Sequence, residues 1–169
     1  MARYRPSRRK SVSLVALVLA VVVWLARGPL KDAFTPAPAP SGAWRTVVRV
    51  VDGDTLVLDG NERVRLIGVD TPETVDPRRP VQYFGKEASA FTKRTAEGKR
   101  ARLEYDQERT DRYGCTLAYV YLEDGTFLNA EIIRQGFGHA YTRFPFRYAD
   151  EFRAYEREAR EQRRGLWAE

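Results

Sequence analysis

The sequence is poor in cysteine and histidine, with Cys115 and His139 as the only residues of each kind. A single cysteine excludes an intramolecular disulfide, so packing must hold the core, with or without help from a metal. We expect Cys115 to be buried, because free cysteines usually occupy small apolar sites. No histidine or aspartate is placed to make it a nucleophile, and we expect His139 to end a helix.

The chain also lacks a charge excess outside its first residues. Of its 29 basic and 23 acidic residues, seven basic and one acidic residue lie in residues 1–43, which leaves 22 of each in residues 44–169. A neutral domain has no bulk attraction to nucleic acid, so any basic binding surface must be local. The length is sufficient for one domain with a real core.

A single long apolar run is present, at residues 12–26, with Ser13 as its only polar residue and five positive charges before it. This pattern indicates an export signal or a membrane anchor. No convincing cleavage site follows, and the charge difference across the run favours a cytoplasmic N-terminus. We expect residues 1–33 to be an uncleaved anchor or a signal peptide, and residues 34–43 to be an extended Pro/Ala linker. The domain at 44–169 would then lie outside the cytoplasmic membrane, anchored or secreted.

Short strands and turn signals dominate this domain. We expect strands at residues 47–51, 55–58, 63–67, 102–105 and 116–122, and helices at 84–96, at 129–135 and from a cap at Asp150 to Gly165. The buried faces of the first and last helices would carry Phe84, Ala88, Phe91 and Thr95, and Phe152, Tyr155, Ala159 and Gln162. Five strands interrupted by a helix predict an α+β fold, a five-stranded OB-fold-like β-barrel with three helices.

Two acidic motifs flank an arginine on a predicted strand. The turn Asp52-Gly-Asp54-Thr is followed, ten residues on, by the segment Arg-Leu-Ile-Gly-Val-Asp-Thr-Pro-Glu at residues 65–73. Carboxylate oxygens suit a hard cation, a spare carboxylate can deprotonate water, and an arginine can hold a phosphate with two hydrogen bonds. A hairpin turn alone explains Asp52, which we leave out of the metal site, but not Asp70. The motifs together predict a metal-assisted site that cuts phosphodiesters.

Further motifs extend the pattern: Phe-Gly-Lys-Glu-Ala-Ser-Ala-Phe at 84–91, Asp-Arg-Tyr-Gly at 111–114, Leu-Ala-Tyr at 117–119, and Asn129. In this order and spacing, residues 44–167 resemble the staphylococcal nuclease (thermonuclease-like) family. The resemblance implies a Ca²⁺ site made by Asp54, Asp70 and the backbone carbonyl of Thr71. It implies Glu73 as the general base and Arg65 as the phosphate-binding arginine. Arg63 shares a strand face with Arg65 and is not singled out by the family.

One position departs from the family. Its second catalytic arginine follows the Tyr-Gly of Asp-x-Tyr-Gly, where this chain has Cys115. A thiol cannot supply two hydrogen bonds or neutralise a phosphorane, and by analogy with arginine fingers the loss costs about 10³ to 10⁵ in rate. The site is expected to be slower, unless Arg109, Arg112 or Arg143 replaces the missing group.

The resemblance also places a nucleotide pocket at Arg112, Tyr113 and Tyr141. Aromatic rings stack on bases there, and cations meet phosphates. Three other tyrosines, Tyr83, Tyr105 and Tyr119, are interpreted as packing residues. The segment at residues 76–80 reads as a basic loop that either contacts nucleic acid or is simply solvated.

The sequence thus predicts an exported, Ca²⁺-dependent nuclease that acts on DNA or RNA with low sequence specificity. Endonucleolytic and exonucleolytic attack both remain open. The alternative is a catalytically degenerate OB-fold module that binds nucleic acid or protein, which the missing arginine motivates. No obligate protein partner is expected.

Overall fold

The structure is a computed structural model that describes residues 42–75 and 80–168. The expected signal or anchor at 1–33, most of the linker at 34–43 and most of the basic loop lie outside the described residues. Within the described part of the chain, no helix combines the length and the apolarity needed to cross a membrane.

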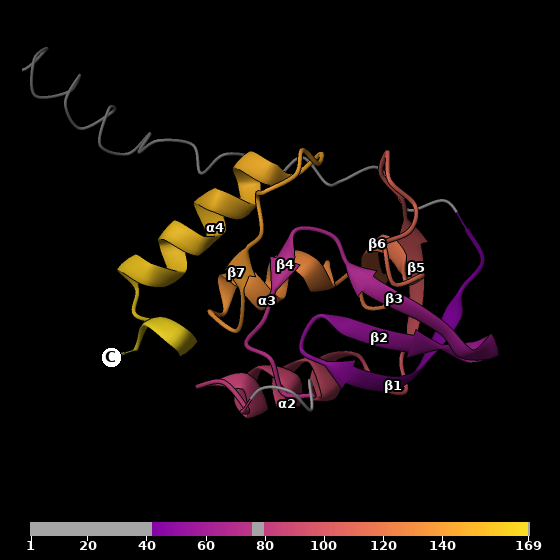
Figure 1. The fold of residues 1–169 in the computed structure, drawn as a ribbon, viewed down its shortest axis with the longest axis horizontal. Helices are drawn as coiled ribbons and strands as arrows, with labels where there is room; N and C mark the ends of the chain where they lie inside the picture. Colours follow the sequence, from indigo (N-terminus) through magenta and orange to yellow (C-terminus); the bar gives the residue numbers. More distant parts are fainter. Residues whose placement is uncertain (1–41, 76–79, 169) are drawn as a thin grey trace, which may run out of the picture. The chain divides into compact units, whose positions relative to one another are not determined.

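Five strands close into the predicted barrel (Figure 1): β1 (Arg45–Asp52), β2 (Thr55–Leu58), β3 (Glu62–Leu66), β5 (Arg100–Glu104) and β6 (Thr116–Leu122). Their order is β1-β2-β3-β6-β5, and β1 pairs with β5 to complete the barrel. The β3–β6 pair is parallel, whereas the other pairs are antiparallel. Closure leaves no open edge between these strands, as an OB-fold requires.

Alternation along β3 separates the core from the site. Val64 and Leu66 are buried in the core cluster, while Arg63 is exposed and Arg65 is half-buried. Since successive side chains of a strand point to opposite faces, one short strand supplies the barrel interior and presents two guanidinium groups outside it.

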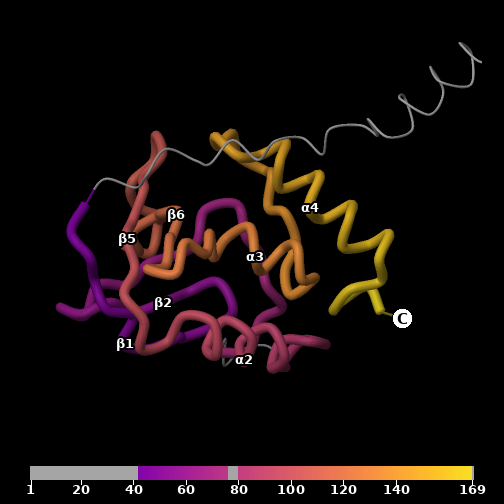
Figure 2. Tube along the Cα trace, turned by 180° about the vertical axis from the view of Figure 1, so that it is seen from behind, coloured from indigo at the N-terminus to yellow at the C-terminus, as the bar shows by residue number. Residues whose placement is uncertain are grey.

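The three helices, seen from behind in Figure 2, are α2 (Gly85–Ala96), α3 (Leu128–Arg134) and α4 (Ala149–Glu161), and α4 packs on α3 and β7. Helix α2 packs on β1, and α3 contacts α2, α4 and β6. Helix α2 buries Ala88, Thr92 and Ala96, while Phe91 and Thr95 are half-buried. Phe91 stacks on Phe137 with ring centroids 4.2 Å apart. The expected face thus included Ala88 but missed Thr92 and Ala96.

The end of the chain corrects three further expectations. Tyr148, not Asp150, precedes α4, and Asp150 lies in its first turn. Gln162 is exposed, since α4 has already ended at Glu161. Gly165 opens the 3-10 helix η2 (Gly165–Trp167) rather than capping α4. A Cβ at Gly165 would lie 2.4 Å from the Gly136 carbonyl oxygen, so glycine is required there for close backbone contact.

A small two-stranded sheet was not expected from the sequence. Strand β4 (Val69–Asp70) pairs with β7 (His139–Ala140), so His139 lies on a strand and does not end a helix. The Tyr141 backbone N–H donates to the Gly68 carbonyl, with 2.9 Å between the two atoms. This sheet therefore brings Asp70 close to Tyr141, although the two residues are 71 positions apart in sequence.

Asn129 fixes the chain where β3 leaves the barrel. Its buried side chain accepts a hydrogen bond from the Val120 N–H at 2.9 Å and donates to the carbonyls of Ile67, at 2.9 Å, and Ala118, at 3.3 Å. These bonds join α3 to β6 and to Ile67, in the segment that leads into β4.

Candidate active site

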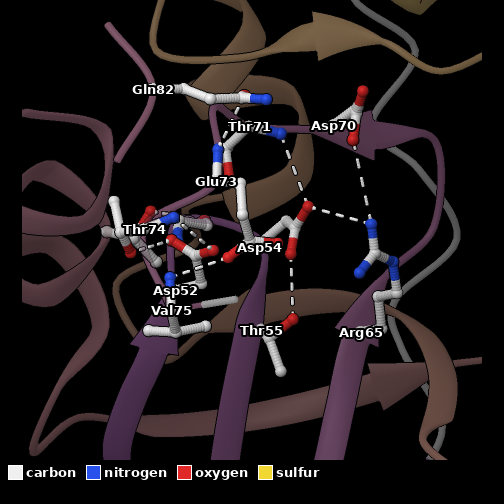
Figure 3. A network of polar contacts seen from close by, with 12 residues as sticks. Asp52, Asp54, Thr55, Arg65, Asp70, Thr71, Glu73, Thr74, Val75 and Gln82 are labelled. Atoms are coloured by element: carbon white, nitrogen blue, oxygen red, sulfur yellow. Dashed lines mark hydrogen bonds and ion pairs between the residues drawn. The ribbon is translucent and has the colours of Figure 1, made fainter. Parts of the chain in front are cut away.

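The acidic residues of the two motifs meet at one end of the barrel. Asp52 and Asp54 flank the turn between β1 and β2, Asp70 ends β4, and Glu73 lies in the loop that follows. In the view of Figure 3, Asp54 lies between Arg65 on one side and Asp52 with Glu73 on the other. Strand pairing explains the convergence, because β2 pairs with both β1 and β3 and Thr55 lies opposite Arg65.

Arg65 bridges the two carboxylates that the sequence predicts as metal ligands. Its Nη2 lies 3.2 Å from Asp54 Oδ2 and 3.8 Å from Asp70 Oδ1. Asp54 is buried and also accepts a hydrogen bond from the Thr55 hydroxyl at 2.8 Å, whereas Asp70 is half-exposed. The Thr71 N–H approaches Asp54 Oδ2 at 3.4 Å. All four predicted residues, Asp54, Arg65, Asp70 and Thr71, therefore lie together.

The negative charge at Asp54 is only partly compensated. Burial raises the pKa of Asp54 to about 6, although the Arg65 guanidinium and the hydrogen bonds from Thr55 and Thr71 oppose the rise. The Asp52 carboxylate adds a smaller upward effect. A buried carboxylate whose charge is only partly compensated attracts a second cation in addition to the Arg65 guanidinium.

The donor atoms fit a hard divalent cation. Asp54 and Asp70 offer carboxylate oxygens, and the buried Thr71 hydroxyl oxygen has no hydrogen-bond partner among the described residues. Thr71 packs so closely on the turn that a Cβ at Gly53 would lie 2.6 Å from its Oγ1. Residues 42–75 and 80–168 contain no group of three or more His, Cys, Asp or Glu arranged around a metal. A cation would thus depend on two carboxylates, backbone oxygen and water, a combination that Ca²⁺ accepts.

Glu73 lies in a loop held by residues that the sequence did not single out. Its Oε1 accepts a hydrogen bond from the Val75 N–H at 2.8 Å, and its own N–H donates to Gln82 Oε1 at 2.9 Å. Asp52 Oδ1 accepts a hydrogen bond from the Thr74 hydroxyl at 2.7 Å. Burial raises the pKa of Asp52, and the neighbouring Glu73 carboxylate raises it further. Asp52 is therefore more than the turn residue that we expected, because it also ties this loop to β1.

Cys115 is buried, as expected, just before β6. Burial raises the pKa of its thiol, Asp111 raises it further, and Arg63 and Arg65 oppose the rise. A thiol with a raised pKa is a poor nucleophile, so the nearby aspartate does not activate it. The parallel register, with Val64 opposite Thr116, brings the start of β3 beside Cys115. Arg63 is thus a candidate replacement for the missing arginine that sequence reasoning overlooked.

The other candidate arginines have different surroundings. Arg109 lies over the Tyr105 ring, 4.1 Å from its centroid, and Arg112 lies over the Tyr113 ring at 4.9 Å. Arg143 is exposed in the loop after β7. Cation–π contacts do not prevent an arginine from binding phosphate, but they give Arg109 and Arg112 a resting position on a ring.

The residues predicted to meet nucleotides are accessible. Tyr113 is 75% exposed and Tyr141 is 36% exposed, and no ring contact joins the two within the described residues. Tyr119 is fully buried, as predicted, and Tyr105 packs against the core. Tyr83 is 63% exposed, so its interpretation as a packing residue is wrong. It precedes Phe84, whose left-handed φ of 62° ends the loop before α2 begins.

The small closed barrel and the acidic, arginine-bridged site at one end define an OB-fold protein with a candidate active site. Comparison with known proteins identifies its family. The model of the family described as staphylococcal nuclease homologues matches residues 63–169. The thermonuclease of Staphylococcus intermedius is 45% identical over 141 residues, which cover 79% of this chain and 82% of that protein. The thermonuclease of Staphylococcus hyicus is 39% identical over 156 residues, 90% of each chain. The endonuclease YncB of Bacillus subtilis is 37% identical over 129 residues, 73% of this chain and 61% of that protein. The chain belongs to the staphylococcal nuclease family.

The raised pKa of Asp54 predicts a stability that depends on pH. A carboxyl whose pKa is higher in the folded state stabilises the fold below about pH 4, and this contribution is lost as the pH rises through about 6. In a chelator, Asp54→Asn should therefore raise the free energy of unfolding at pH 8 by about 2 kcal/mol and change it little at pH 4. Urea denaturation at the two pH values measures the difference.

Asp124 provides a control of opposite sign. Hydrogen bonds from Thr126 and Lys99 lower the pKa of Asp124 to about 2, so its ionised form stabilises the fold above about pH 4. Asp124→Asn should lower stability at pH 8. A decrease in stability at pH 8 for Asp54→Asn as well would contradict the interpretation of Asp54 as a charge buried at a cost.

Proposed function

We propose that this protein is a Ca²⁺-dependent nuclease that hydrolyses phosphodiester bonds in DNA or RNA with low sequence specificity. The observation that carries the proposal is Arg65, whose guanidinium contacts both Asp54 and Asp70 beside the loop of Glu73. The named relatives, two thermonucleases and an endonuclease, support nuclease activity and favour internal cleavage.

The cation would be held by Asp54, Asp70 and the carbonyl oxygen of Thr71. When bound, Ca²⁺ would polarise a phosphate oxygen and offset the charge of the two carboxylates. Arg65 at present contacts the same two carboxylates and offsets part of their charge. Its contacts with them would weaken once they have another positive partner, which leaves the guanidinium available for a phosphate. The arginine and the cation are therefore competitors for the same oxygens until substrate arrives.

The remaining chemistry would use the side chains of the chain itself. Glu73 accepts a proton from a water molecule, whose oxygen attacks phosphorus. Arg65 donates hydrogen bonds to the phosphate oxygens as their negative charge grows. The bond between phosphorus and one sugar oxygen breaks, and that oxygen leaves as an alcohol after it takes a proton from solvent. Charge stabilisation by Arg65 and proton removal by Glu73 act on opposite sides of Asp54 in Figure 3.

Low sequence specificity would follow from the exposed rings. Tyr113 and Tyr141 can stack on any base, since every base has a π face, and Arg112 beside Tyr113 can meet a phosphate. Neither ring offers a set of hydrogen bonds that would distinguish one base from another. Stacking also favours single strands, whose bases are accessible.

We further propose that the nuclease domain, residues 44–169, is exported. The positive charges before the apolar run at 12–26 and the Pro/Ala linker at 34–43 support an anchor or a signal peptide at 1–33. The domain would be anchored to the cytoplasmic membrane and face outward, or be secreted.

The first test of function is cleavage by the full-length protein in mild detergent. Wild-type protein should cut single-stranded DNA or RNA with Ca²⁺ and stop in EGTA. Glu73→Gln should lower kcat by about 10² or more, because the amide cannot accept the proton. Arg65→Ala should lower activity by about 10² or more while Ca²⁺ affinity, measured by calorimetry, stays equal or rises.

Glu161→Gln serves as a control, since Glu161 is exposed at the end of α4. No cleavage of any nucleic acid with Ca²⁺ present would defeat the enzyme proposal. Nucleic-acid binding that persists unchanged in Asp54→Ala and Glu73→Ala, without turnover in any variant, would instead establish the binding module.

The second test concerns Cys115. If the site lacks only one charge-stabilising group, Cys115→Arg should raise kcat by about tenfold or more and leave KM nearly unchanged, because the lost interaction matters most in the transition state. Cys115→Ala should keep the wild-type rate, since the buried thiol has no catalytic part in the proposal. Single-turnover cleavage assays measure both effects.

Arg63→Ala distinguishes a slow site from a compensated one. If Arg63 already serves as the second arginine, Arg63→Ala should abolish activity and Cys115→Arg should restore it in that background. Arg157→Ala, an exposed arginine of α4, controls for loss of charge. If neither Cys115→Arg nor Arg63→Ala changed the cleavage rate, the proposal that an arginine acts beside Cys115 would be contradicted.

The third test concerns location. A reporter fused after Glu169 should be active only outside the cytoplasmic membrane, and membrane fractions should retain the chain if the anchor is uncleaved. A mature protein that begins after residue 26 would indicate secretion. A reporter that scores as cytoplasmic would overturn the proposed orientation.

A further inference from the structure

The loop that carries Glu73 is closed at its base by Gln82. The Glu73 N–H donates to Gln82 Oε1, and the Gln82 N–H donates to the Glu73 carbonyl oxygen, each over 2.9 Å. Figure 3 places the Gln82 side chain directly above the backbone of Glu73. Two reciprocal hydrogen bonds thus join residues nine positions apart and satisfy both backbone groups of Glu73.

Gln82 is itself placed by α2, which begins three residues later. A Cβ at Gly85 would lie 2.7 Å from Thr74 Cγ2 and 3.0 Å from the Pro72 carbonyl oxygen, so the start of α2 packs tightly on the loop of Glu73. Further along α2, the buried Thr92 hydroxyl donates to the Gly53 carbonyl at 2.7 Å. The helix therefore contacts both the turn that bears Asp54 and the loop that bears Glu73.

The Glu73 carboxylate interacts with Val75 in the same loop and with Asp52 at the end of β1. The hydrogen bond from Val75 to Glu73 Oε1 lies within the same loop and would move with it. The Asp52–Thr74 contact ties the neighbouring residue to β1. Gln82 holds the Glu73 peptide group itself through its side chain. Loss of that acceptor would remove one of the two reciprocal hydrogen bonds between these residues, so the Glu73 peptide group would be held less firmly.

We propose that Gln82 is a positioning residue for hydrolysis, which holds the backbone of Glu73 so that its carboxylate meets the attacking water. The inference rests on the proposed function, in which Glu73 is the general base. A displacement of about 1 Å in a reacting group can cost about 10² in rate, so a side chain that never touches substrate can control kcat. Among the described residues, the hydrogen bonds of Gln82 go to Glu73 and Gly85 and not to Asp54, Asp70 or Arg65.

Three substitutions of Gln82 distinguish the loss of its hydrogen-bond acceptor from the loss of side-chain volume. Gln82→Ala and Gln82→Met both remove the acceptor, and methionine keeps most of the length of the side chain. Both should lower kcat about tenfold, with KM and Ca²⁺ affinity within about twofold of wild type. Gln82→Glu retains a side-chain oxygen at the same reach and should recover most of the rate. Gln135→Ala is the matched control, because it removes an exposed glutamine that donates to Glu131 at 2.8 Å.

Hydrogen exchange provides a readout that does not depend on activity. The Glu73 amide should exchange faster in Gln82→Ala and Gln82→Met than in wild type, and Gln82→Glu should restore its protection. Amides of the barrel core should be unaffected, and the melting temperature should change little. This measurement detects the contact between Gln82 and Glu73 even if the protein does not cleave nucleic acid.

The outcomes distinguish this inference from the proposed function. An active wild type, an inactive Glu73→Gln and an unchanged kcat in Gln82→Ala would overturn the positioning role and leave the function standing. A fall in kcat that Gln82→Glu does not recover would also count against the inference. An inactive wild-type protein would defeat the proposed function instead, and unchanged Glu73 exchange in Gln82→Ala would then remove the structural basis of the inference as well.

Discussion

The ion pair between Arg65 and the buried Asp54 is the interaction on which the site depends. Asp54 lies where water is excluded, and its nearest fixed positive group is the guanidinium 3.2 Å away. Breaking such a pair by removing the cation leaves an uncompensated charge, which is more costly than never burying it. The barrel must therefore keep Arg65 at the rim, and the outward alternation of β3 does so without disturbing the buried Val64 and Leu66 on either side.

Close backbone packing gives this charged rim its rigidity. The turn at Gly53 presses on Thr71, and Gly68 presses on Phe146 and Phe152 so tightly that a Cβ there would lie 2.6 Å from the Phe146 ring. Gly53 lies between β1 and β2, and Gly68 lies between β3 and β4, outside the strands themselves. The side chains of Asn129 and Thr92 add hydrogen bonds to the backbone near these turns. Glycine contacts and buried polar side chains thus hold the site together with the strand pairing.

Local patterns predicted most of the fold and the charged part of the site. Turn signals and alternation identified the five barrel strands, and the family resemblance singled out Asp54, Arg65 and Asp70, which the structure places close together. The missed features depend on contacts between distant residues. Strands β4 and β7 are two residues long and have no periodicity, and nothing in the neighbourhood of Gln82 marks it as a partner of Glu73. Gly165 was misread because a glycine for close approach to Gly136 has the same appearance in sequence as a helix-ending glycine.

Cys115 lies just before β6, beside two arginines of the neighbouring strand β3. The parallel pairing of β3 with β6 places the start of β3 next to Cys115, and both Arg63 and Arg65 act electrostatically on its thiol. Arg65 is already shared between two carboxylates, whereas Arg63 is exposed and forms no ion pair with any described residue. A long, flexible arginine on the same outward face can reach space that a cysteine leaves empty. The positive charge beside Cys115 thus comes from β3, so the electrostatics at the start of β6 depend on both strands.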